Sequence, residues 1–130
     1  MSMNNAESSE PTLDISLLEG LVALQIEGQP DVIAEISGLF IEEASKRIAD
    51  AEAALASGDA ILLRRSAHTI RGACGMLGAQ RLATLAGTLE AAAETKRDGL
   101  AEMVKDLAEE FDQVRTLLRP YLAGHEERTR

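Results

Sequence analysis

Apolar residues recur every three or four positions through four long stretches of the chain, and turn-forming residues separate the stretches. In the stretch 30–56 the recurring residues are Ile33, Ile36, Phe40, Ala44, Ile48, Ala51 and Leu55. This spacing places them on one face of an α-helix with 3.6 residues per turn. Helices of this kind must bury their apolar faces against one another, so the pattern favours an all-α fold.

The same spacing predicts further helices over 59–77, 79–96 and 100–119, separated by Gly58, Gly78 and the Asp98-Gly99 pair. Four long amphipathic helices joined by short turns predict an antiparallel up-down four-helix bundle. A short extra N-terminal helix over 15–26, with Asp14 as its N-cap, is expected to cover one end of the bundle.

Prolines and charged segments mark the expected boundaries. Pro30 is well placed to open the second helix, and Pro120 lies near the end of the last. The predicted organisation is a disordered N-terminal tail over 1–11, the bundle over 12–122 and a charged C-terminal tail over 123–130. The starting Met1 and the acidic N-terminal segment favour a complete protein over a fragment of a longer chain.

The composition argues against several classes of function. The formal net charge is −9, aromatic residues make up 2% and there is no Trp, so neither a basic face nor a stacking platform for nucleic acid is expected. The chain contains no run of about 18 apolar residues, so no membrane span is expected. The single cysteine, Cys74, suits a cytoplasmic location. Because the chain lacks a Gly-rich phosphate loop, a CxxC pair and an HExxH helix, we expect neither a resident cofactor nor a metal site.

An unusual face surrounds His68. This residue follows Ala67, which lies on the apolar seam of the helix predicted over 59–77, the face that packs into the bundle. His68 is therefore expected to point outward at the margin of this seam. The residues stacked with it at helical spacing are Arg64, Arg65, Arg71 and Gly72, with Ile61 and Gly75 one turn further away. Each mid-helix glycine costs about 1 kcal/mol relative to alanine. The glycines therefore favour a docking surface that another backbone approaches closely.

Each of these features also has a simpler interpretation. A lone histidine is most often a boundary residue, and helix arginines are usually solvated charges. The two glycines would also suit close packing inside the bundle or a weak last helical turn.

Glu90 is expected to lie level with His68. If the helices over 59–77 and 79–96 form a hairpin that turns near residue 79, the two residues face each other across it. A carboxylate that bonds one ring nitrogen fixes the tautomer and leaves the other nitrogen as a nucleophile. The alternative is that Glu90 is an ordinary surface glutamate.

This constellation suits phosphoryl transfer better than hydrolysis. A neutral imidazole is a competent nucleophile at cellular pH, and Arg71, one turn on from His68, could neutralise phosphate oxygens. Phosphoryl transfer depends mainly on positioning and charge neutralisation. A partner would have to supply Mg²⁺ and the other reacting group.

The stretch from Ala67-His68 through Arg71-Gly72 to Leu77-Gly78 resembles the signature of histidine-containing phosphotransfer (HPt) domains. Leu82, Leu85 and Leu89 with Glu90 also fit the family, and the similarity covers about residues 13–120. The family usually has lysine where this chain has Arg71. The arginine keeps the charge, but its planar fork is larger and differently aimed, which leaves the detailed phosphate contact open.

The resemblance implies a phosphocarrier in a multistep two-component phosphorelay. His68 would accept a phosphoryl group from a receiver-domain aspartate or a hybrid kinase and pass it to the aspartate of another response-regulator receiver. Such domains have no kinase activity of their own, and Mg²⁺ would be on the partner receiver. The family also often places Gln or Glu in contact with the histidine, at the position of Glu90.

A docking patch for receiver domains is expected around His68. Its basic part would be Arg64, Arg65 and Arg71, and its apolar part Ile61, Gly72, Gly75, Met76, Ile15 and Leu18. Ile15 and Leu18 would equally serve as a cap on the bundle core. We expect the protein to be a monomer.

Two other classes of function compete with a phosphocarrier. One is an interaction module that binds a receiver domain or a partner helix without phosphotransfer, although retention of His68 and Arg71 argues against it. The other is a metal- or cofactor-binding bundle. The apolar seams and the presence of only two histidines argue against that class.

Overall fold

Five α-helices and one short 3₁₀ turn make up the part of the chain that the structure describes. The structure, a computed structural model, describes residues 11–28, 31–95 and 98–129. The elements are α2 (Ile15–Ala23), α3 (Val32–Ser57), α4 (Ala60–Ala73), η1 (Cys74–Met76), α5 (Gln80–Thr95) and α6 (Leu100–Thr129). The predicted tail over residues 1–10 and the predicted turn residues 29–30 lie outside the described residues.

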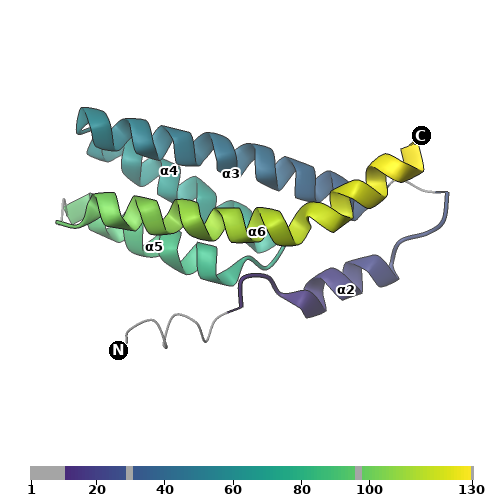
Figure 1. The fold of residues 1–130 in the computed structure, drawn as a ribbon. Coiled ribbons are helices and arrows are strands. Elements are labelled where there is room, and N and C mark those ends of the chain that lie inside the picture. Colours follow the sequence, from purple (N-terminus) through teal and green to yellow (C-terminus); the bar gives the residue numbers. More distant parts are fainter. Residues whose placement is uncertain (1–10, 29–30, 96–97, 130) are drawn as a thin grey trace.

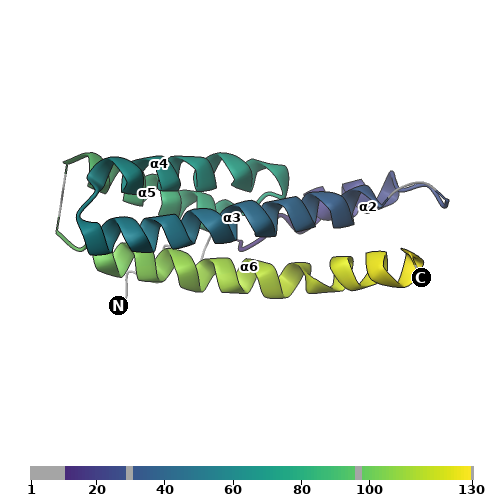
Figure 2. The same cartoon turned by 90° about the horizontal axis from the view of Figure 1, so that it is seen from above.

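Helices α3, α4, α5 and α6 form the predicted antiparallel bundle. Each packs against its two neighbours in the order α3, α4, α5, α6 and back to α3. Figures 1 and 2 show that α4 and α5 form a short hairpin, while α3 and α6 extend well beyond it. Helix α2 lies at this extended end and contacts α3. No described helix is both long and apolar enough to cross a membrane.

The predicted seams form one continuous apolar core. Its largest fully buried side chains include Phe40, Ile70, Leu82, Leu89 and Leu107. The rings of Phe40 and Phe111 lie 6.2 Å apart and join α3 to α6. Each fully buried side chain of this size contributes about 1.5–3 kcal/mol to folding, so the core holds the bundle together.

Local capping sets several helix ends where the sequence predicted them. The side chains of Asp14 and Asp59 accept hydrogen bonds from Leu17 N–H at 3.1 Å and from Leu62 N–H at 3.0 Å. Gly58 ends α3 in the left-handed conformation, at φ +72°. These short-range interactions satisfy the free backbone groups at helix ends.

Two helix ends near the N-terminus differ modestly from the predictions. Helix α2 ends at Ala23 rather than near residue 26. Helix α3 begins at Val32, and Asp31 caps it by accepting a hydrogen bond from Ala34 N–H at 3.1 Å. The aspartate cap fixes the start of α3 because its carboxylate satisfies a free amide of the first turn.

The last helix extends further than predicted. It was expected to end near residue 119, but α6 continues through Pro120 to Thr129. Proline lacks the N–H of a helical residue, so its position alone suggested an end. The side chain of Leu122 approaches α3 at Gly38, and Tyr121 packs against the core. Packing on α3 therefore carries the helix past the proline.

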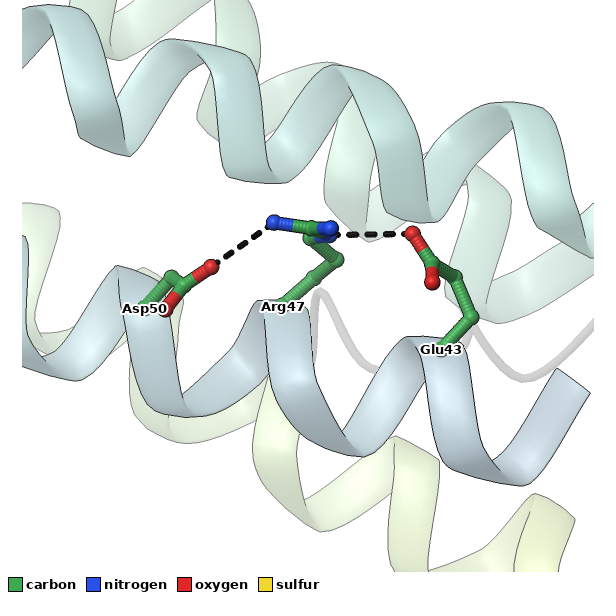
Figure 3. Close-up of polar contacts among 3 residues, drawn as sticks. All are labelled: Glu43, Arg47 and Asp50. Carbon is green, nitrogen blue, oxygen red and sulfur yellow. Dashed lines mark hydrogen bonds and ion pairs between the residues drawn. The ribbon is translucent and has the colours of Figure 1, made fainter.

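The exposed side of α3 carries a small ion-pair cluster. Figure 3 shows Arg47 lying between Glu43 and Asp50, and each carboxylate is 2.9 Å from the guanidinium. Hydrogen bonding to Glu43, followed by its charge, raises the pKa of Arg47 above the usual range. The three residues are spaced one helical turn apart, so the cluster supports α3 itself rather than a site between helices.

Candidate functional site

His68 lies on the middle of α4 and faces solvent. Its neighbours Ala67 and Ile70 are fully buried in the core, which fixes the rotation of α4. The side chain of His68 is therefore 63% exposed, as the sequence predicted from its place beside the seam. A partner molecule can reach this imidazole without any rearrangement of the bundle.

Glu90 on α5 holds the ring of His68. Its Oε2 lies 2.9 Å from His68 Nδ1, which confirms the contact expected from the hairpin. A carboxylate can only accept a hydrogen bond, so Nδ1 carries the proton and Nε2 keeps its lone pair. Glu90 is mostly buried, with 19% of its side chain exposed. The partly buried carboxylate thus orients the imidazole and leaves Nε2 available as a nucleophile.

Arg71 is the second side chain that pairs with the carboxylate of Glu90. Its Nη2 lies 3.4 Å from Glu90 Oε1, while the other carboxylate oxygen is held by His68. The side chain of Arg71 is about half exposed. A positive charge thus lies beside the imidazole and remains accessible to an anion from solvent.

Gly72 and Gly75 are exposed on the same side of the molecule as His68. A Cβ placed on either glycine would meet no atom within 4 Å. Close packing inside the bundle therefore does not explain these glycines. Ile61 and Met76 are also exposed, at 60% and 45%. Ile61, Gly72 and Gly75 are spaced from His68 by whole helical turns, so the sequence places them on its face of the helix.

The end of α4 differs from its predicted form. The α-helix stops at Ala73, and the residues Cys74–Met76 form a 3₁₀ turn instead of the predicted continuation to residue 77. Gly75 lies inside this turn and Gly78 follows at φ +65°. Glycine weakens helical structure, so Gly72 and Gly75 also suit the alternative of a weak last turn before Gly78.

Two further arginines lie on the histidine side of α4. Arg65 is exposed and Arg64 is half buried, and neither forms an ion pair with another described residue. With Arg71 they give a basic patch on a protein whose net charge is −9. Such a patch favours an acidic partner surface.

Two residues of α2 were predicted to lie in the docking patch, but only one of them is exposed. Ile15 is 52% exposed, but Leu18 is fully buried and belongs to the core. The backbone N–H of Asp14 donates to Gly78 O at 2.9 Å, which fixes α2 at the turn between α4 and α5. This attachment turns Leu18 inward, so Leu18 as a partner-binding residue is wrong.

Cys74 is a buried residue of the core, with 1% of its surface exposed. Burial, followed by the charge of Glu110, raises the pKa of the Cys74 thiol to about 12, so the thiol stays protonated. Among the described residues, no group of three or more His, Cys, Asp or Glu side chains is placed to hold a metal ion.

Comparisons with known proteins point to one family. Residues 35–118 match the family model described as the Hpt domain. The chain is 28% identical over 103 residues to histidine-containing phosphotransfer protein 2 of Arabidopsis thaliana, covering 76% of this chain and 66% of that protein.

A solved structure shows the same similarity in three dimensions. It is the crystal structure of histidine-containing phosphotransfer protein B from Pseudomonas aeruginosa PAO1. The two chains share 28% identity and superpose with a TM-score of 0.74, over 87% of this chain and 96% of the other.

Proposed function

The chain belongs to the Hpt domain family, and from this premise we propose that it is a phosphocarrier of a two-component phosphorelay with His68 as the phosphoacceptor. The observation that carries the proposal is the hydrogen bond between His68 Nδ1 and Glu90 Oε2 at 2.9 Å. It leaves the unprotonated Nε2 of an exposed ring as the nucleophile.

The proposed reaction takes the phosphoryl group from an aspartyl phosphate of a receiver domain. The Nε2 lone pair forms a bond to phosphorus, and the bond between phosphorus and the aspartate oxygen breaks with its electrons. The aspartate leaves as a carboxylate, so no proton has to move to the leaving group. Nδ1 keeps its proton, and Glu90 stabilises the positive charge that develops on the ring.

Arg71 is proposed to neutralise the transferred group. Its guanidinium lies beside the imidazole and is about half exposed, so it can bond phosphoryl oxygens that arrive at Nε2. The loose transition state of phosphoryl transfer spreads charge over these oxygens, and a nearby cation stabilises them. Passage to the aspartate of a second receiver is the reverse of the same step. The partner receiver would supply Mg²⁺, and the chain would have no kinase activity of its own.

Receiver domains, with a sensor or hybrid histidine kinase upstream, are the proposed partners. Around His68 they would meet the exposed Ile61, Gly72, Gly75 and Met76, the basic Arg64 and Arg65, and Ile15 from α2. The absence of bulk at the glycines suits close approach of a partner backbone. A monomeric state and a cytoplasmic location stay predictions from the sequence.

The test is phosphorylation of the purified protein by a receiver domain that carries an aspartyl phosphate. Acid-labile, base-stable phosphate is mapped by mass spectrometry in the wild type and in His68→Ala and His68→Gln. We expect phosphate on His68 alone, none in either variant, and an unchanged circular dichroism spectrum because the ring is 63% exposed. A well-folded wild type that several receivers and kinases fail to label would instead favour a non-catalytic interaction module.

A further inference from the structure

Gly87 on α5 has one near neighbour, and that neighbour belongs to the site. A Cβ placed on Gly87 would lie 3.4 Å from the Cδ of Arg71 and would meet no other atom within 4 Å outside its own stretch of α5. Gly87 precedes Glu90 by three residues, so both lie on the same side of α5. Glycine weakens the middle of a helix relative to alanine, and nothing in the backbone of α5 calls for one here, since φ at Gly87 is not positive.

The side chain of Arg71 lies against α5, where it passes Gly87 and reaches Glu90. The carbon stem crosses from α4 to α5 at Gly87, and the guanidinium reaches Glu90 Oε1 at 3.4 Å. The second oxygen of the same carboxylate bonds His68 Nδ1 at 2.9 Å. The arginine stem therefore passes a residue that has no side chain, and the ion pair holds its charged end beside the imidazole.

We propose that Gly87 is a positioning residue, which leaves the space on α5 that seats Arg71 beside His68. The role in transfer rests on the proposed function. An arginine side chain has many rotamers, and holding it in one of them before the phosphoryl group arrives reduces the ordering cost during the reaction. The absence of a side chain at Gly87 leaves room for the stem, while the ion pair with Glu90 holds the charged end.

Replacement of Gly87 should move Arg71 rather than unfold the bundle. An alanine methyl group would just touch the stem at 3.4 Å, whereas a leucine side chain would occupy the place of the stem. Arg71 is about half exposed, so it can swing into solvent at little cost to the fold. Both replacements raise the helix propensity of α5, so lost stability would not explain lost activity.

The kinetic experiment measures the rate of phosphoryl transfer from a phosphorylated receiver to His68 in variants with side chains of increasing size at position 87. We expect a rate close to the wild type in Gly87→Ala, whose methyl group only touches the stem, and a loss of about tenfold in Gly87→Leu, equal to the loss in Arg71→Ala. The matched control is Thr88→Leu, an exposed position about 100° further round α5, which should transfer at the wild-type rate.

A double variant separates positioning from docking. In the Arg71→Ala background, Gly87→Leu should cause no further loss, because there is no arginine left to displace. A further loss of similar size in that background would overturn the proposal, since leucine would then act on the partner. A wild-type rate in the single Gly87→Leu variant would overturn it as well.

An NMR measurement tests whether Gly87 sets the position of the Arg71 side chain, and it does not depend on phosphotransfer. The Arg71 Nε–H resonance is identified in ¹H–¹⁵N spectra by its loss in Arg71→Lys. It should shift in Gly87→Leu and in Glu90→Gln and stay unchanged in Thr88→Leu. An unchanged resonance in Gly87→Leu would refute the positioning role of Gly87, even if His68 carries phosphate. A shifted resonance in a protein that never accepts phosphate would instead refute the proposed function and leave the positioning role in place.

Discussion

The carboxyl group of Glu110 is the most strongly buried acid among the described residues, with 6% of the residue exposed. Burial raises its pKa, while a hydrogen bond from Thr12 and the charge of Arg81, at 3.8 Å, act in the opposite direction. Because burial is the largest of these effects, the ionised form of this group weakens the fold. Glu110 therefore contributes to the pH dependence of stability.

The sign of that dependence follows from the raised pKa. The folded protein holds this proton to a higher pH than the unfolded chain does. Any stabilisation from the protonated form is present below the unfolded pKa and is lost as the pH rises through the folded one. We expect Glu110→Gln to raise the melting temperature at pH 7 by about 2–4 °C and to have little effect near pH 3, where both forms are neutral.

The matched control for this prediction is Glu109→Gln, which removes the same charge from an exposed neighbour. Thermal melts of both variants at the two pH values separate burial from net charge. A lower melting temperature for Glu110→Gln at pH 7 would mean that the attraction of Arg81 outweighs burial.

Residues of the site differ in how far the sequence alone could place them. The contact between His68 and Glu90 was predictable because the turn of a helical hairpin fixes which residues lie level. The approach of the Arg71 stem to Gly87 was not predicted, because it depends on how far one flexible side chain reaches. A glycine inside α5, one turn before Glu90, was the available signal. Leu18 was misplaced because the periodicity of a nine-residue helix does not say which side faces the bundle.

At the scale of the elements, the turn at Gly78 joins α2 to the α4–α5 hairpin. Gly78 has φ +65°, and a Cβ on it would lie 2.5 Å from the Cβ of Asp14. Its carbonyl also accepts the N–H of Asp14 at 2.9 Å. This one residue therefore needs glycine both for its backbone conformation and for the space that α2 occupies.

Gly78→Ala should cost more stability than the same change at Gly58. Gly58 also has a positive φ, of +72°, but a Cβ there would meet no atom within 4 Å. Urea unfolding should give a loss of about 1 kcal/mol for Gly58→Ala, from backbone strain alone. The loss should reach about 3 kcal/mol for Gly78→Ala, because the start of α2 must also move. Equal losses would show that α2 is not seated on this turn.

Helix ends were predictable where local capping sets them and were missed where packing sets them. The cap residues Asp14, Gly58 and Asp59 act within a few residues, so the sequence contains the whole interaction. The course of α6 beyond residue 119 depends on the approach of Leu122 to α3 at Gly38. That contact joins residues far apart in the chain, and a local pattern does not reveal it.

Pro120 should be a weak point of α6. It lies inside the helix and has no N–H to donate to the carbonyl of Thr116. Pro120→Ala restores this donor, but it also gives the unfolded chain more conformational freedom, which opposes folding. We therefore expect a net increase of about 2 kcal/mol in the free energy of unfolding by urea. Arg119→Ala is the control at the neighbouring exposed position. No increase over this control would mean that α6 ends before the proline in solution.

For the whole molecule, the site lies on the shorter pair of helices of the bundle. Helices α4 and α5 have 14 and 16 residues, whereas α3 and α6 have 26 and 30. Figures 1 and 2 show that the longer pair continues past the hairpin, with α2 at that end. The site residues His68 and Glu90 come from the short hairpin alone. Periodicity predicted the four-helix architecture and the greater length of α3, but not that of α6.

The distribution of charge should govern encounter with a partner. The chain has 22 acidic and 13 basic residues, yet Arg64, Arg65 and Arg71 lie together on the histidine side of α4. A local basic patch on an acidic protein orients an approaching acidic surface toward that side and repels it elsewhere. Salt should weaken this steering, because the Debye length falls from about 30 Å at 0.01 M to about 3 Å at 1 M.

Charge reversal at Arg65 should therefore slow association with a receiver far more than the same reversal elsewhere. Arg65→Glu and Lys46→Glu both change the net charge from −9 to −11, but Lys46 lies exposed on α3. In stopped-flow measurements at low salt we expect an association rate about tenfold lower for Arg65→Glu and close to the wild type for Lys46→Glu. The difference should shrink as salt is raised. If both variants slow association equally, net charge rather than the patch beside His68 controls the encounter.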